Sequence, residues 1–152
     1  MPSFAAPFSL PDTFERSLKG FLSYWEGLKR AGNEMPFWDD LKPPALSDQS
    51  EKLVLIDVFV QPERFRFNFL ATELTQRYGE TLVRQFADEI SLREPFAYLR
   101  AQCSATVESG RPTYFRYDAS DTSPGSASYS RILLPLWGEG QIRMLLGAVD
   151  WR

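Results

Sequence analysis

Residues 52–70, which read KLVLIDVFVQPERFRFNFL, decide the fold of this chain. The stretch 52–60 is rich in valine, leucine and isoleucine, a composition typical of a β-strand. A short turn follows around Pro62. Residues 64–70 then alternate between polar side chains and phenylalanines, which predicts a half-buried antiparallel strand. The two strands form a predicted β-hairpin, and the side chains expected to face the core are Phe65, Phe67 and Phe69.

After this hairpin the spacing of apolar residues changes from that of a strand to that of a helix, and near residue 110 it returns to that of a strand. Helical spacing covers residues 72–79 and 82–86, and a longer helix is predicted over 95–109, because proline is tolerated in a first helical turn. Strand patterns then return in three segments, the last two of which are joined by a turn at Gly138-Glu139-Gly140. The three segments are 112–117, 127–136 and 141–151.

The order of elements is therefore two strands, several short helices and three strands. Such an order cannot give an all-parallel sheet without a crossover helix at each connection. The economical arrangement is a five-stranded antiparallel sheet with short helices gathered on one face. The sequence thus predicts an α+β fold for residues 52–152.

An amphipathic helix is predicted ahead of this domain. Residues 1–11 show little periodicity and are an expected tail, whereas Asp12 is the expected N-cap, with Glu15 completing a capping box. Residues 12–51 therefore comprise an N-terminal helix and a connector. The apolar helix face either covers one side of the core or packs against a second copy in a homodimer, and both alternatives stay open. The residues of this face are Phe14, Leu18, Phe21, Leu22, Trp25 and Leu28.

Composition excludes several kinds of function. The chain has 152 residues, 17 Lys+Arg against 20 Asp+Glu, no histidine and one cysteine. The length suits one domain, and a net charge of −3 gives no electrostatic reason to bind nucleic acid. Without histidine there is no Ser-His-Asp triad, no Cys/His zinc site and no histidine-bound haem. No signal peptide or bilayer-length apolar run is visible, so we expect a cytoplasmic protein without a membrane partner.

Adjacent acidic residues and strand arginines are the remaining polar candidates. The carboxylate pairs Asp39-Asp40 and Asp88-Glu89 are interpreted as solvated surface, because neighbouring residues do not share a helix face. Three strand arginines either form an anion site or make ion pairs, and exposed arginines are the commoner case. They are Arg64, Arg66 and Arg116.

The loop at 118–126 contains residues that are similar to part of the Asp-x-Ser-x-x-Gly loop of cyclic-dinucleotide receptors. The spacing is one residue short, and the upstream arginine motif of those receptors is absent. Ordinary turn chemistry is therefore the favoured interpretation. The residues are Asp121, Ser123 and Gly125.

Several local sequences carry a family resemblance. They are Tyr24–Arg30 (YWEGLKR), Met35-Pro36, Leu53–Val58 (LVLIDV), Arg64–Phe67 (RFRF), Ile132–Leu136 (ILLPL) and the turn at 138–140. In the order ββ-ααα-βββ they resemble a PAS-like domain, and more specifically the small stand-alone bacterial PAS family with an N-terminal helix. This resemblance implies a non-enzymatic sensory or adaptor domain in signalling, which binds a small ligand or a protein partner and acts through protein–protein contacts.

The resemblance also implies a compartment between sheet and helices for a small apolar ligand, although a filled core without ligand is the favoured alternative. The cofactor is unknown. A flavin-reactive cysteine would lie in an Asn-Cys-Arg-Phe type of motif, whereas Cys103 lies in Ala101-Gln102-Cys103-Ser104 on a later helix, so we interpret it as core. The predicted pocket residues are Phe65, Phe67, Phe69, Tyr98, Cys103, Leu134 and Leu146.

A second hypothesis is a small-ligand carrier or an enzyme with a cone-shaped α+β fold similar to ketosteroid isomerase. In that fold the helices come first and a long curved sheet follows, whereas the predicted helices here interrupt the strands. A deep open pocket with a buried carboxylate of shifted pKa would favour this alternative.

Overall fold

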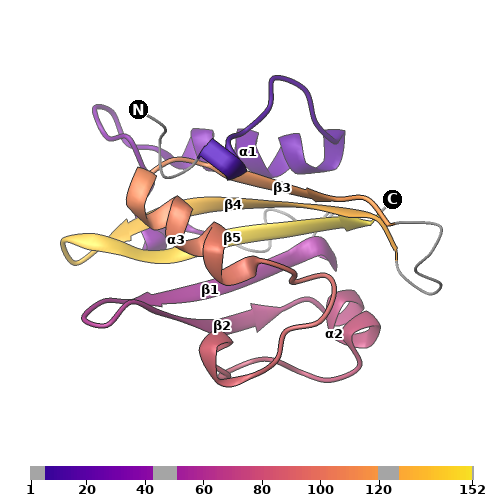
Figure 1. Ribbon diagram of the computed structural model, residues 1–152. Helices are drawn as coiled ribbons and strands as arrows, with labels where there is room; N and C mark the ends of the chain where they lie inside the picture. The colour runs from indigo at the N-terminus through magenta and orange to yellow at the C-terminus, as the bar shows by residue number, and fades with distance from the viewer. Residues whose placement is uncertain (1–5, 43–50, 120–126, 152) are drawn as a thin grey trace.

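The computed structural model describes residues 6–42, 51–119 and 127–151. Its five strands form one antiparallel sheet in the order β2-β1-β5-β4-β3 (Figure 1). The α-helices are α1 (Arg16–Leu28), α2 (Thr72–Tyr78) and α3 (Leu99–Ser109), and the short 3-10 helices are η1 (Ala6–Phe8), η2 (Trp38–Asp40) and η4 (Ala87–Glu89). The strands are β1 (Leu53–Phe59), β2 (Arg64–Leu70), β3 (Thr113–Tyr117), β4 (Tyr129–Gly138) and β5 (Gln141–Trp151).

This arrangement is the predicted α+β, PAS-like fold. The strands of the β1–β2 hairpin and of the β4–β5 hairpin lie within one or two residues of the sequence prediction. Helices α2 and α3 come between β2 and β3. Because helices interrupt the strands in the chain, the cone-shaped fold of the second hypothesis, with helices before the sheet, is wrong.

Each edge strand of the sheet contacts another segment. On β2, the backbone N–H of Phe67 donates to Gln85 O at 3.0 Å and its carbonyl accepts from Arg84 N at 2.7 Å. On β3, Thr113 forms a bridge with Ser9. Such contacts cover part of each edge, where free backbone groups would otherwise be able to pair with another chain.

The pairing at the β2 edge explains why the predicted helix at 82–86 is absent. The N–H of Arg84 and the carbonyl of Gln85 bond to Phe67 of β2, and Phe86 forms a bridge with Arg66, so this segment runs along the edge of the sheet. The N–H of Gln85 closes a single turn with Leu82 O at 2.9 Å. The helical spacing of Leu82 and Phe86 therefore reflects burial against the sheet. The short 3-10 helix η4 follows directly after this segment.

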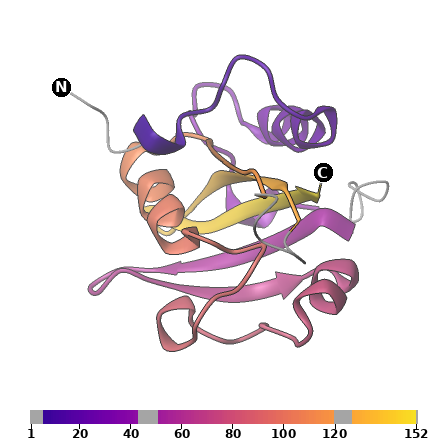
Figure 2. The ribbon, with the colours of Figure 1, turned by 45° about the vertical axis from the view of Figure 1, so that its right-hand side comes forward.

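Two apolar clusters lie on opposite faces of the sheet. The inner cluster lies between the sheet and the segments α2, η4 and α3 and includes Val54, Phe67, Leu82, Phe96 and Leu133. The outer cluster lies between the sheet and α1 and includes Leu18, Phe21, Leu134 and Leu146. Figures 1 and 2 show α1 apart from α2 and α3, along the part of the sheet formed by β3, β4 and β5.

A register shift in the hairpin corrects one prediction. Leu55 is paired with Phe69, but the next residue, Ile56, is paired with Phe67, so Asn68 is an extra residue on β2. This bulge ends the strict alternation of sides. Phe65 and Phe67 are buried in the inner cluster, whereas Phe69 is 41% exposed and opposite Leu55 of the outer cluster.

Helix α1 begins later than its sequence pattern predicts. Glu15 is its N-cap residue, and no side chain caps the first turn. The Glu15 carboxylate instead accepts a hydrogen bond from the Tyr114 hydroxyl at 2.6 Å. The predicted capping box from Asp12 is therefore wrong, because a contact with β3 engages the carboxylate that it needs.

The apolar face of α1 packs against the sheet of its own chain. Leu18, Phe21 and Trp25 are buried, and the Trp25 indole N–H donates to Pro135 O of β4 at 2.8 Å. The other three residues of the predicted dimer face, Phe14, Leu22 and Leu28, are partly buried. The structure therefore supports the alternative in which α1 covers the core, and a homodimer through this face stays a prediction.

We expect the substitution Phe21→Ala to lower the free energy of unfolding by about 3–5 kcal/mol, because it removes a fully buried ring and leaves a cavity. Urea denaturation followed by circular dichroism measures this change. The control is Ser23→Ala, an exposed position on the same helix, for which a change within about 0.5 kcal/mol is expected. Equal effects of the two substitutions would contradict the packing of α1 on the sheet.

Candidate functional site

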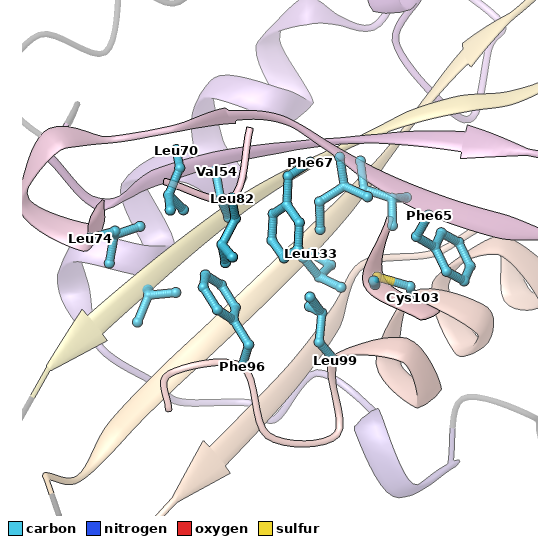
Figure 3. Packing of buried hydrophobic residues seen from close by; sticks show 14 of the residues in the cluster. Val54, Phe65, Phe67, Leu70, Leu74, Leu82, Phe96, Leu99, Cys103 and Leu133 are labelled. Atoms are coloured by element: carbon cyan, nitrogen blue, oxygen red, sulfur yellow. The ribbon is translucent and has the colours of Figure 1, made fainter. Parts of the chain in front are cut away.

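The space between the sheet and the α2–η4–α3 segments is the compartment in which the resemblance places a ligand. In this chain, side chains occupy much of it. Phe67 of β2 contacts Phe96 edge-to-face, with ring centroids 5.3 Å apart, and Tyr78 of α2 lies 5.9 Å from Phe96. Figure 3 shows the side chains of β1 and β2 pointing toward those of Phe96 and Leu99. All of these residues are buried.

The structure brings together three of the seven predicted pocket residues, Phe65, Phe67 and Cys103, in the inner cluster (Figure 3). Leu134 and Leu146 belong to the outer cluster, because their neighbours Leu133 and Leu145 are the ones that face α3. The prediction for these two leucines is wrong by one residue, which in a strand reverses the side.

The other two predicted pocket residues are at the surface. Phe69 is turned outward by the bulge, and Tyr98 is 71% exposed. Tyr98 precedes α3 with left-handed backbone angles, φ 58° and ψ 21°, which are uncommon for an aromatic residue. Its ring lies against Phe115 of β3 at 5.9 Å.

A fully buried arginine, Arg131 on β4, is the main polar group of the compartment, and no local sequence pattern indicates its burial. Its Nε donates to Gln102 Oε1 at 2.7 Å. Its two terminal nitrogens donate to the backbone carbonyls of Pro95 and Ala97, each at 2.9 Å. The guanidinium also lies over the ring of Phe115, 4.8 Å from the centroid. Arg131 thus joins β4 to α3 and to the segment that precedes α3.

These bonds explain why α3 begins at Leu99 and not at Pro95 as predicted. The carbonyls of Pro95 and Ala97 point to Arg131, so the segment 95–98 is shaped around the guanidinium and does not form a helical turn. Because Arg131 is buried, its pKa is lowered to about 10, although nearby Tyr129 and Glu94 oppose this change. A pKa of about 10 still leaves the group charged at neutral pH.

Further polar groups extend the network on both sides of Arg131. The Gln102 amide donates to Thr113 Oγ1 at 3.1 Å, and Thr113 and Thr106 share a hydrogen bond of 2.6 Å. The Tyr129 hydroxyl donates to the Glu94 carboxylate and accepts from Ala97 N. Burial, and then the hydrogen bond to Glu94, raise the pKa of Tyr129. The network therefore consists of paired groups.

Cys103 has the environment of a core residue. It is fully buried on α3, and burial raises the pKa of its thiol to about 12. Since the thiolate is the nucleophilic form, a thiol with this pKa is unreactive at neutral pH. The structure thus favours the core interpretation of Cys103.

Three of the four predicted acidic candidates, Asp40, Asp88 and Glu89, form ion pairs. Arg64 pairs with Asp88 at 3.2 Å and with Glu89 at 2.6 Å. The hydrogen bond from Arg64 lowers the pKa of Asp88. Asp40 pairs with Arg30 at 2.9 Å, and that hydrogen bond lowers its pKa too.

The other two predicted strand arginines also form ion pairs. Arg66 pairs with Asp57 and Arg116 with Asp118. Because β2 and β3 are opposite edges of the sheet, Arg116 does not share a site with Arg64 and Arg66. Asp121, Ser123 and Gly125 lie outside the described residues.

The described ranges contain neither a metal-binding cluster nor a helix that could span a membrane. No group of three or more Cys, Asp or Glu residues there is arranged to hold a metal ion. In the same part of the chain, no helix has the length and apolar character needed to cross a bilayer.

Comparisons with known proteins give matches to solved structures alone. No protein-family model matches the chain, and no curated protein matches its sequence. The Rhodobacter sphaeroides LOV protein is 15% identical, with a TM-score of 0.46 over 88% of this chain and 67% of that one. A fungal LOV domain photoreceptor is 12% identical, with a TM-score of 0.48 over 91% and 95%. With TM-scores below 0.5, no property of these photoreceptors is carried over to this chain.

We expect Arg131→Met to lower the free energy of unfolding by about 3 kcal/mol. Each buried acceptor left unpaired costs roughly 1–3 kcal/mol, and the removal of a buried charge offsets part of that cost. Urea denaturation measures the change. Arg116→Met is the matched control on β3, because this arginine side chain is 55% exposed and should contribute less than about 0.5 kcal/mol. An unchanged stability of Arg131→Met would show that the network does not hold the segment 95–98.

Alkaline pH provides a test of the Cys103 environment. Because the folded thiol keeps its proton up to a pKa of about 12 while an unfolded thiol loses it near pH 9, stability from this group is complete below pH 9 and falls as pH rises toward 12. The slope is at most about 1.4 kcal/mol per pH unit. We expect stability to fall less steeply in Cys103→Ala than in the parent between pH 9 and 10.5. Identical slopes, or rapid thiol labelling of the native protein at pH 8, would contradict this environment.

Proposed function

We propose that this chain is a non-enzymatic PAS-like sensory or adaptor domain in bacterial signalling, and that it acts through protein–protein contacts. The observation that carries the proposal is the occupied compartment between the sheet and α3. Phe67, Phe96 and Leu133 pack there against one another, and Arg131 bonds the segment 95–98. Because side chains occupy this interior, we infer that the domain signals through contacts at its surface and not by binding a small molecule between the sheet and α3.

Tyr98 is the surface residue that we propose for partner contact. It is the most exposed large hydrophobic side chain among the described residues. It is also adjacent to Ala97, whose carbonyl accepts from Arg131, and its ring lies against Phe115. A partner that contacts Tyr98 is therefore one residue away from the buried network. Aromatic side chains are enriched at such contacts because they bury a large area with few rotatable bonds.

We also propose a homodimer, and its interface has to leave the buried face of α1 in place. Leu18, Phe21 and Trp25 of α1 are buried within the chain. A second copy therefore binds through other surfaces, or α1 leaves its own sheet to reach that of the partner. The first route preserves the outer cluster and is the one we propose.

Native mass spectrometry of the protein purified from its own host tests this function. We expect a dimer or a stoichiometric complex with a protein partner. This complex should weaken at least tenfold in Tyr98→Ala, whereas Val60→Ala, which truncates another exposed apolar side chain on the β1–β2 turn, should leave it unchanged. A monomer without a protein partner, or a complex that Tyr98→Ala leaves unchanged, would contradict the proposal.

A further inference from the structure

A hollow of about 390 Å³ lies on the outer face of the sheet, outside the compartment considered above. Its lining comes from β1, β2 and β5 and from Trp38 of the connector between α1 and β1. No residue of helix α1 is in this lining, and in Figure 2 the helix lies away from the β1–β2 hairpin. The volume is within the range of small-molecule sites.

One side of the hollow is formed by the ion pair of Asp57 and Arg66. Asp57, whose side chain is 16% exposed, accepts from Arg66 Nη2 at 3.0 Å and from Asn68 Nδ2 at 3.2 Å. Arg66 in turn lies over the ring of Phe59, 4.9 Å from its centroid. The charges of Asp57 and Arg66 balance each other, so this side contributes hydrogen-bonding groups without net charge.

The opposite wall carries an arginine whose countercharge is weakly held. The guanidinium of Arg143 lies over the Trp38 ring, 4.8 Å from the centroid. Its ion pair is with Glu139 at 3.4 Å, and the Glu139 side chain is 70% exposed. A pair of this length and exposure has little net stability in water. The lining residues Arg66, Arg143 and Asp57 therefore leave the hollow with one net positive charge.

The position of Trp38 beside Arg143 depends on a glycine. A Cβ atom at Gly138 would lie 2.2 Å from Trp38 Cδ1, so any larger residue would displace the indole. The connector at Trp38 is also tied to the chain just after α1, because Arg30, two residues beyond the end of that helix, pairs with Asp40, two residues after Trp38. The aromatic side of the hollow is thus built from the connector and the β4–β5 turn together.

We propose that this hollow binds a small carboxylate that carries an aromatic or apolar group. The carboxylate replaces Glu139 on Arg143, because a planar guanidinium can donate two parallel hydrogen bonds to a carboxylate. Gln141, whose side chain makes no hydrogen bond within the described part of the chain, is a further donor in the lining. The apolar group lies between Phe59, Met144 and Trp38. This site rests on the hollow alone and holds whether or not the chain acts in signalling.

Benzoate titration into ¹⁵N-labelled protein, followed by NMR, tests the proposal. We expect benzoate to shift the indole N–H signal of Trp38 and the amides of β5, while the uncharged isostere benzamide binds at least tenfold more weakly, because the charge-assisted bond to Arg143 is lost. Equal binding of benzamide, or equal shifts with inorganic phosphate, would contradict a site for an apolar carboxylate.

Three variants separate this site from general electrostatic attraction. Arg143→Gln should weaken benzoate binding at least tenfold, whereas Glu139→Gln should strengthen it, because it removes the competing carboxylate. Arg116→Gln, on the opposite edge of the sheet, removes the same charge and should leave affinity unchanged. The spectra of each variant report whether it is folded. Equal losses in Arg143→Gln and Arg116→Gln, or weaker binding to Glu139→Gln, would overturn the proposal.

Discussion

The guanidinium of Arg131 is the group on which the inner half of the structure depends. A buried charge is costly unless its donors are satisfied, and here they are satisfied by Gln102 of α3 and by two carbonyls of the segment before α3. Those partners fix the start of α3 and the path of residues 95–98. Phe96, between the two carbonyls, is thereby held against Phe67. A single side chain on β4 thus determines how the helical layer is placed over the sheet.

The outer half is organised by a different interaction, the packing of α1. Its three buried side chains cover the outer face of β4 and β5, and the Trp25 indole bonds to β4. Farther along this face, the hollow lined by Asp57, Phe59 and Arg66 has no residue of the helix in its lining. The inner face of the sheet is therefore covered by α2, η4 and α3. The outer face carries α1 and the polar hollow.

Local patterns were sufficient to predict the strands, because residues 64–70 alternate between polar and apolar side chains and the other long strands are largely apolar runs. The predictions failed where distant residues set the local structure. The bulge at Asn68 reversed Phe69, pairing with β2 replaced the helix at 82–86, and Tyr114 engaged the carboxylate of Glu15. The burial of Arg131 had no local signal, since its acceptors are about 30 residues away in the chain. The prediction for Leu134 and Leu146 as pocket residues was wrong, because successive side chains of a strand point to opposite faces of the sheet.

Hydrogen exchange at the Arg131 side chain tests the central claim most directly. Its Nε–H is donated to Gln102 in a fully buried position. We expect a separate NMR signal for this proton at neutral pH. It should exchange with water far more slowly than the signals of exposed arginines such as Arg116, and it should lose this protection in Gln102→Ala. An Arg131 Nε–H that exchanges as fast as that of Arg116 would contradict the role of the buried guanidinium in placing α3.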